Sequence, residues 1–476
     1  MSTAMNVPSR GWSGVGGGAQ RHVPIPPEWR GTSVQVCGLW PFAVGAGAPM
    51  IGVPFGRNLR TGTTVCFDPI SWFQRAALIS NPSMFVLGKP GLGKSSAVRR
   101  IMLGLDGYGT HSMVLGDLKG EHIDLIRAIG GQVIEIGRGR SQLNPLDTGM
   151  AREAATLLTG QERAEMLADA HGRRLTMLTG LVQLARNEPP TDREEAILDR
   201  ALAVLDERVE GVPVLRDVLE VIRQAPNEVR QVAIDHGSID RYRQITEGLE
   251  ATLMSMLSGK FGEIFAGQTT TRMKIDRSVV FDVSSIEDGD TALQAAVLLA
   301  CWSYGFGTIS VANALADAGV APRRHYFVVM DELWRALRSG RGMVDRVDAL
   351  TRLNRQWGTG QAMITHTMSD LDAIASEEDR AKARGFVERS GVVLCGGLPR
   401  GEMTQLTKAI PLSEKEQDML VGWQDPPMWD SATGRESTPP GRGNFLIKVG
   451  GRPGIPVHVE LTGAELSLND TNKAWK

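Results

Sequence analysis

The sequence of 476 residues is poor in cysteine, carries no excess of either charge and shows no internal repeat. Its four cysteines, Cys37, Cys66, Cys301 and Cys395, stand far apart without C-x-x-C spacing, which excludes the common zinc motifs and indicates reduced thiols. The net charge of -2 gives no bulk attraction to nucleic acid, so any DNA contact must come from a local patch. Hydrophobic residues at 42% and charged residues at 22% indicate a folded chain, and its length predicts about two to four structural units.

Targeting signals are also missing. The first residues, MSTAMNVPSRGWSG, lack the charged-then-apolar order of a signal peptide, so we expect a cytoplasmic protein. The uncharged stretch 291–316 is long enough to raise the possibility of a membrane helix. Polar residues and glycines interrupt it, which favours a buried helix followed by a turn, and we expect no membrane segment in this chain.

Strand and helix patterns alternate through much of the chain. Several short runs are apolar throughout rather than alternating, which is typical of strands covered on both faces. They predict an α/β fold with a mostly parallel central sheet between helices. The runs are Met84–Leu87, Ser112–Leu115, Val133–Ile136, Val279–Val283, Tyr326–Met330, Ala362–Ile364 and Gly391–Leu394.

Other stretches have a different rhythm and predict further units around this sheet. Thr191 and Glu194 form a capping box ahead of a helical apolar pattern, which indicates an all-helical insertion. Gly, Pro and Ser enrichment marks a flexible start and a late linker. We therefore expect a flexible segment at 1–36, a short β lead-in packing on the core at 37–82, the core at 83–148 and 263–424, the insertion at 149–262, a linker at 425–442 and C-terminal strands packing back on the core at 443–476.

The strongest motif follows the first apolar run. The segment GKPGLGKS matches G-x-x-x-x-G-K-[ST] between a predicted strand and a helical pattern at Ser95–Leu105. Its glycines let backbone N–H groups surround a β-phosphate, and Lys94 and Ser95 suit the β/γ-phosphates and Mg²⁺ of bound ATP. A glycine-rich turn without a ligand is the weaker alternative. The residues expected to bind nucleotide are Gly88, Lys89, Pro90, Gly91, Leu92, Gly93, Lys94, Ser95 and Ser96.

A second motif ends the apolar run His325–Met330. Asp331 suits the Mg²⁺ shell, and Glu332 can polarise the attacking water as a general base. A helix N-cap pair is the alternative for these two acids. Because other strands come between this run and the P-loop in sequence, the layout is that of RecA-like P-loop ATPases.

Two further features are candidates for the same site. Thr365 and His366 close the strand Ala362–Ile364 and suit sensing of the γ-phosphate, although a surface histidine fits equally well. The segment Asp117–Glu121 could face the site or a neighbouring subunit, or form a solvated turn.

RecA-like ATPases often use an arginine from the next subunit, which stabilises charge in the transition state. Arg384, Arg389 and Arg400 are the candidates, and we select Arg389. The arginine-rich stretch Trp334–Trp357 could face nucleic acid or a subunit, but a solvated helix is favoured.

Seven segments together resemble the ATPases of conjugative and type IV secretion systems, namely the secretion-energising ATPase and the DNA-pumping coupling proteins. The likeness runs from about Gly52 to Trp475, and the C-terminal part is similar to actinobacterial-type versions. The segments are GKPGLGKSS (88–96), VLGDLKGEH (114–122), LNPLD (143–147), GKFGEIFAG (259–267), VVFDVSSI (279–286), VVMDELW (328–334) and ITHTMSDL (364–371).

The resemblance implies a RecA-like motor with an inserted helical domain, assembled as a homo-oligomer, a hexamer, that couples ATP hydrolysis to transfer of protein or DNA. It also implies contact with membrane-bound conjugation or secretion components at the inner face of the cell membrane. Family members commonly have glutamine where this chain has His366. They also carry an N-terminal domain or membrane helices that we do not find here, so we expect a separate protein to supply that part.

The function predicted from these observations is an ATP-hydrolysing motor that powers conjugative transfer or type IV-like secretion. A DNA translocase or coupling protein is the alternative that shares this chemistry. A nucleotide-gated assembly scaffold is the alternative of another class, and the Glu332 base argues against it.

Overall fold

The computed structural model describes residues 50–338, 343–351, 358–374, 376–427, 429–430, 435–436 and 439–468. The predicted flexible segment 1–36 therefore lies outside the described residues, as do Cys37 and Trp475. A two-stranded pair, β10 (Trp429–Asp430) with β11 (Arg435–Glu436), lies within the range predicted as a linker.

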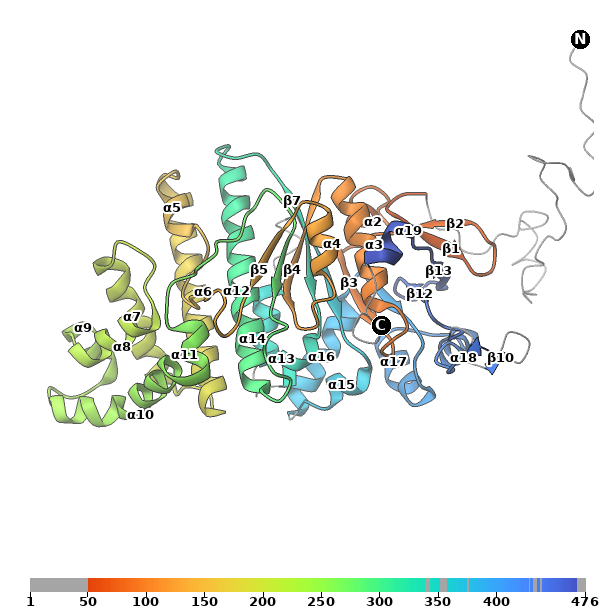
Figure 1. Cartoon of the computed structure of the whole chain (residues 1–476). Coiled ribbons are helices and arrows are strands. Elements are labelled where there is room, and N and C mark those ends of the chain that lie inside the picture. The colour runs from red at the N-terminus through yellow and green to blue at the C-terminus, as the bar shows by residue number, and fades with distance from the viewer. Residues whose placement is uncertain are drawn as a thin grey trace, which may run out of the picture.

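One large sheet organises the described chain, in the order β2-β1-β13-β12-β9-β3-β8-β7-β4-β6-β5. The strands from β9 to β5 all pair in parallel, and β12, β13, β1 and β2 extend the sheet with antiparallel pairs (Figure 1). All seven apolar runs are strands, so the prediction of a mostly parallel sheet is confirmed. The bounds are β1 Pro54–Asn58, β2 Thr64–Cys66, β3 Ser83–Leu87, β4 Thr110–Asp117, β5 Gln132–Glu135, β6 Val279–Asp282, β7 His325–Met330, β8 Thr359–Ile364, β9 Val392–Cys395, β12 Asn444–Lys448 and β13 Ile455–Val459.

Helices cover both faces of this sheet, as uniformly apolar strands require. Met84 and Val86 of β3 pack with one group of helices, while Phe85 and Leu87 between them pack with the other. The first group is α2 (Pro69–Gln74), α3 (Lys94–Gly107) and α4 (Ile123–Ala128). The second is α12 (Thr291–Asp317), α13 (Leu333–Arg338), α14 (Met343–Thr351), α15 (Met368–Asp372), α16 (Glu377–Arg389), α17 (Met403–Ala409) and α18 (Glu414–Gly422).

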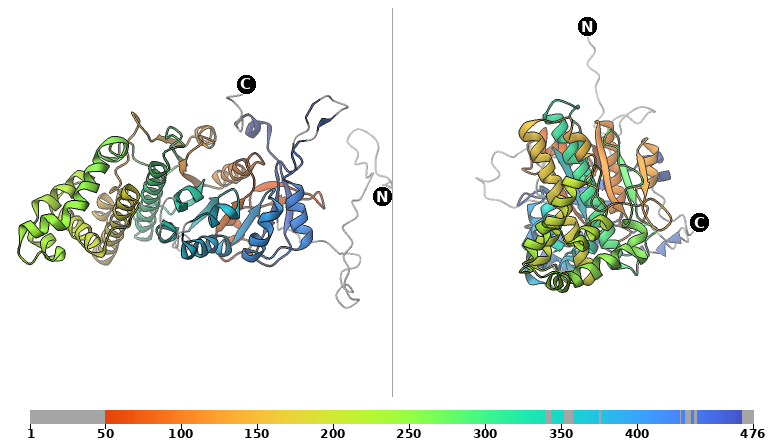
Figure 2. Two further views of the ribbon diagram at one scale, coloured as in Figure 1. Left: turned by 90° about the horizontal axis from the view of Figure 1, so that it is seen from below. Right: turned by 90° about the vertical axis from the view of Figure 1, so that its left-hand side faces the viewer.

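The elements between β5 and β6 are helical. The two views of Figure 2 show them stacked beyond α12, on the side away from the C-terminal strands. The longest, α6, packs along α12. Their bounds are α5 Ala151–Ala155, α6 Gly160–Arg186, α7 Asp192–Arg208, α8 Leu215–Gln224, α9 Asn227–Ala233, α10 Ile239–Leu257 and α11 Gly259–Phe265.

The uncharged stretch 291–316 forms one continuous helix, α12, so the turn expected within it is wrong. Within the described part of the chain, α12 is the one helix long and apolar enough to cross a membrane. Its most apolar window is 94% buried between the sheet and α6, because its glycines and small residues let neighbouring elements approach. This burial explains why α12 is apolar and uncharged, because it is a core helix.

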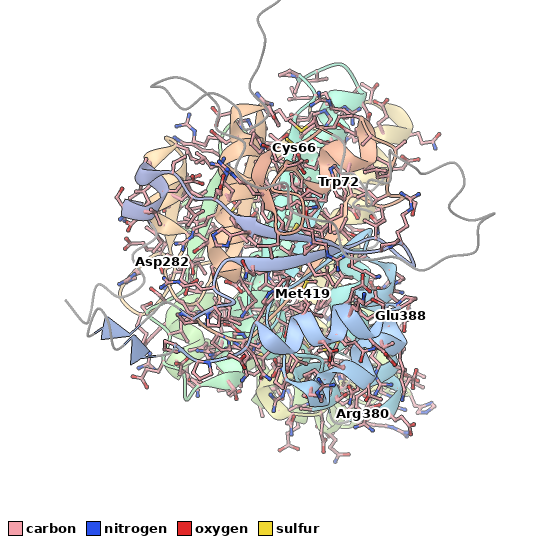
Figure 3. The ribbon with its side chains drawn as sticks, turned by 90° about the vertical axis from the view of Figure 1, so that its right-hand side faces the viewer. Cys66, Trp72, Asp282, Arg380, Glu388 and Met419 are labelled. Atoms are coloured by element: carbon pink, nitrogen blue, oxygen red, sulfur yellow. The ribbon has the colours of Figure 1, made fainter. Side chains whose placement is uncertain are left out.

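A buried ion pair fixes the C-terminal strands to the helical layer. Lys448 of β12 donates to both carboxylate oxygens of Glu416 in α18, at 3.0 and 3.1 Å. Glu416 also accepts the backbone N–H groups of Ser413 and Gly454. Their side chains are only 3% and 7% exposed, so neither charge has much access to water. Figure 3 looks onto this side of the molecule, where Met419 labels α18.

Lys448→Met should lower the free energy of unfolding by about 3 kcal/mol, because it leaves the Glu416 carboxylate buried without its cation. Urea unfolding checks this, with the exposed Lys408→Met as the matched control. Equal stability of the two variants would show that the ion pair of Lys448 and Glu416 does not stabilise the packing of β12 and β13 on the helical layer.

Candidate active site

Three strand ends meet at one edge of the sheet. β8 lies between β3 and β7, with Val86 opposite Ile364 and Met330 opposite Met363. Because parallel strands place their carboxyl ends at the same edge, the P-loop after β3, His366 after β8 and the acids after β7 converge there. The two motifs predicted from sequence are therefore brought together.

The P-loop has the backbone that an anion cradle requires. Gly91 and Gly93 have φ values of 80° and 96°, a region that other residues adopt only with strain. α3 begins directly after Gly93, which has no side chain to bond the first N–H groups of the helix, so these groups are available to an anion. The loop is held at both ends: Gly88 N–H donates to His366 O at 2.9 Å, and Leu92 O accepts from Gly443 N–H at 3.0 Å.

Lys94 lies folded over this loop. Its Nζ donates to Gly88 O at 2.6 Å, to Lys89 O at 3.3 Å and to His366 Nδ1 at 3.1 Å. Burial lowers the pKa of Lys94 to about 8, although Asp331 and Glu332 act in the opposite direction. Phosphate oxygens can replace these acceptors, and they carry the negative charge that a buried ammonium needs.

Asp331 is a buried carboxylate whose oxygens can accept further contacts. Its Oδ1 accepts the Glu332 N–H at 2.8 Å, while Oδ2 lies 3.6 Å from His122 Nε2, which is longer than a hydrogen bond. Burial raises the pKa of Asp331, but His122 and Lys119 outweigh it and the net shift is downward, so the group is ionised. Asp331 also interacts electrostatically with Lys94, the neighbour of Ser95 at the start of α3. An ionised carboxylate there suits Mg²⁺, which prefers oxygen ligands, so the residues present fit the ion.

Glu332 is only 3% exposed, yet three side chains reach it. Lys119 Nζ pairs with Oε1, His366 Nε2 lies 3.4 Å from Oε2, and the Trp334 indole N–H donates to Oε2. Its φ of 51° is in the left-handed region, which is uncommon for a residue with a side chain and frequent at functional sites. Since Lys94 donates to Nδ1, the network assigns the proton of His366 to Nε2, and a neutral imidazole bridges Lys94 and Glu332.

The segment Asp117–Glu121 turns into this site. Asp117 accepts the N–H groups of Lys119, Glu121 and His122 at 3.3, 3.1 and 2.7 Å, which fixes the loop so that Lys119 meets Glu332. His122, which sequence reasoning missed, is fully buried, and neither ring nitrogen has a hydrogen-bond partner among the described residues. Burial lowers the pKa of His122, but the effect of Asp331 and Asp117, which raise this pKa, is larger. The net shift is therefore upward.

The arginines proposed to act on a neighbouring subunit each form an ion pair within the chain. Arg384 pairs with Asp372 at 2.7 Å, Arg389 with Asp348 at 2.9 Å and Arg400 with Asp418 at 2.8 Å. The action of Arg389 on a second subunit stays a prediction.

Part of the arginine-rich stretch Trp334–Trp357 lies outside the described residues. Within the described part, the guanidinium carbons of Arg335 and Arg338 each lie 5.2 Å from the Trp334 ring centroid. Two of the arginines therefore stack on the tryptophan that contacts Glu332.

No family model matches the chain, and no curated protein matches its sequence. Solved structures do match its fold. The structure of VirB4 of Thermoanaerobacter pseudethanolicus superposes with a TM-score of 0.65 at 20% identity, covering 88% of this chain and 100% of that chain. The chain has the VirB4 fold.

Two other solved structures are more distant in shape. The plasmid coupling protein TrwB in complex with ADP and Mg²⁺ has a TM-score of 0.48 at 13% identity, covering 88% of this chain and 97% of that chain. The cytoplasmic domain of the type VII secretion ATPase EccC of Thermomonospora curvata has a TM-score of 0.34 at 13% identity, covering 88% of this chain and 30% of that chain. The fold therefore rests on the VirB4 comparison, and at 20% identity the activity has to be argued from the site.

His366→Gln should keep most ATP turnover, because a glutamine amide can also accept from Lys94 and donate to Glu332. His366→Ala removes the hydrogen bond with Lys94 and the contact with Glu332, and should lower kcat by about 100-fold. Steady-state ATPase assays of both variants check this. An equal loss of kcat in the two variants would show that the contacts with Lys94 and Glu332, which glutamine can also make, do not explain the role of His366.

Proposed function

We propose that the chain is an ATP-hydrolysing motor that powers conjugative transfer or type IV-like secretion. The observation that carries the hydrolytic part is the continuous contact from Lys94 through His366 to Glu332, which joins the P-loop to the acids after β7. The resemblance of seven sequence segments to conjugation and secretion ATPases, together with the VirB4 fold, supports the motor assignment.

The chemistry needs groups that the site contains. The water oxygen forms a bond to the γ-phosphorus, and the bond from that phosphorus to the bridging oxygen breaks, its electron pair leaving on ADP. Glu332 takes the proton of the attacking water, and Lys94 balances charge on the β- and γ-phosphates. Ser95 and Asp331 would hold Mg²⁺, which would supply further neutralisation of the phosphate charge.

The assembly and location proposed for this motor follow the same resemblance. The chain acts as a homo-oligomer, a hexamer, in the cytoplasm at the inner face of the membrane, where membrane-bound secretion or conjugation components recruit it. Arg389 of α16 acts in this assembly on the nucleotide of the next subunit. Mass measurement with and without ATP tests the assembly.

The two alternatives differ in what can be observed. A DNA translocase should show ATP turnover that rises with DNA and loses that rise steeply with salt, whereas a secretion motor should not. A nucleotide-gated scaffold should assemble on ATP and need no turnover. The burial of Glu332 among Lys119, His366 and Trp334 favours hydrolysis, because a pure binding site has no use for a positioned base.

Glu332→Gln should bind ATP with the affinity of the unmodified protein and lose about 100-fold or more in kcat, since the amide cannot accept the water proton. Calorimetric ATP binding and phosphate release measure the two effects. The matched control is Glu378→Gln on the surface of α16, which should leave both unchanged. Undiminished turnover in Glu332→Gln would reject the assignment of the base.

A further inference from the structure

Lys119 is a cation at the site that the proposed reaction has not used. It lies on the loop between β4 and α4, and its Nζ pairs with Glu332 Oε1. Its side chain is 42% exposed, whereas the Glu332 side chain is 3% exposed, so Lys119 reaches from the surface to a buried carboxylate. The Asp117 carboxylate holds the backbone of the loop, and the four-carbon stem stays free to pivot.

Lys94 and Lys119 act on the same pair of acids. Asp331 and Glu332 raise the pKa of both lysines, and Lys119 lowers the pKa of Lys94 by repulsion. Contacts also join them: Lys94 Nζ lies 3.1 Å from His366 Nδ1, His366 Nε2 lies 3.4 Å from Glu332 Oε2, and Lys119 Nζ pairs with Glu332 Oε1. One polyanion beside Glu332 can therefore contact both ammonium groups. Lys94 is held by carbonyl oxygens of the P-loop and Lys119 by a carboxylate, and phosphate oxygens can replace either kind of acceptor.

The contacts of Glu332 raise a chemical difficulty that Lys119 can resolve. A general base needs an oxygen able to accept the water proton, yet Oε1 is paired with Lys119 and Oε2 is engaged by His366 and Trp334. Transfer of Lys119 from Oε1 to the γ-phosphate frees that oxygen and places a positive charge on the group that is being transferred.

We infer that Lys119 is a catalytic residue that binds the γ-phosphate, moving from Glu332 to the phosphate as negative charge develops on it. The inference rests on the proposed ATPase function. In the step itself the water oxygen bonds to the γ-phosphorus, the bridging oxygen leaves with ADP, and the water proton goes to Glu332. Lys119 stays protonated throughout and contributes charge and a hydrogen bond, the role that arginine fingers have in other ATPases.

Three variants test this inference. Lys119→Met removes the charge and keeps most of the stem, and Lys119→Arg keeps the charge. Lys260→Met is the matched control, because Lys260 is 45% exposed and also forms one short ion pair with a carboxylate, Asp290, at 2.6 Å. Each variant is measured for ATP affinity, for kcat and for affinity toward ADP with aluminium fluoride, which mimics the transferring phosphate.

Lys119→Met should lower kcat by about 100-fold while its ATP affinity stays within about threefold, because the contact is strongest in the transition state. It should also lose the extra affinity for ADP with aluminium fluoride over ADP alone. Lys119→Arg should recover part of both losses, and Lys260→Met should match the unmodified protein. A merely structural role for Lys119 would lower ATP affinity together with kcat.

A kcat for Lys119→Met equal to that of the unmodified protein overturns the inference and leaves the ATPase proposal standing. An increase in kcat overturns it too, since it would show that Lys119 restrains the base rather than serving the phosphate. Absence of ATP turnover in the unmodified protein would overturn the proposed function and this inference with it.

Discussion

Two adjacent carboxylates buried at the end of β7 are the constraint on which the rest of the site depends. Asp331 and Glu332 are 8% and 3% exposed, and buried charges are stable only when they are paired. Their partners come from separate segments: Lys94 from the P-loop, Lys119 and His122 from the loop after β4. The order β3-β8-β7-β4 places those segments side by side, so the strand order of the sheet brings the cations to the buried acids.

The neutral bridge of His366 gives this charge arrangement a way to respond to a ligand. Its Nδ1 accepts from Lys94 and its Nε2 faces Glu332, so movement of Lys94 toward phosphate changes the surroundings of the base. The loop that Lys94 covers is tied to β8 through Gly88 and to the C-terminal strands through Leu92. The proposed nucleotide site is thereby connected to the neighbouring strand β8 and to the C-terminal strands, which are anchored by the buried pair of Lys448 and Glu416.

Much of this could be predicted from the sequence because the signals are local. An apolar run followed by a glycine-rich turn and a helix defines the P-loop within one stretch, and Asp331 and Glu332 follow directly on a strand. The contacts of His122 and Trp334 with the two acids could not be predicted, because they depend on which strands become neighbours. The position of β12 between β9 and β13 is non-local for the same reason. The glycines of α12 suggested a turn, whereas tertiary packing keeps the helix continuous.

We propose that a triphosphate lies on the P-loop with its γ-phosphate between Lys94 and the acids after β7. The decisive experiment is a structure of the protein with Mg²⁺ and a non-hydrolysable ATP analogue. We expect the γ-phosphate within hydrogen-bond distance of Lys94 Nζ and the metal ion beside Ser95 and Asp331. A nucleotide bound elsewhere, or a γ-phosphate directed away from Glu332, would contradict it.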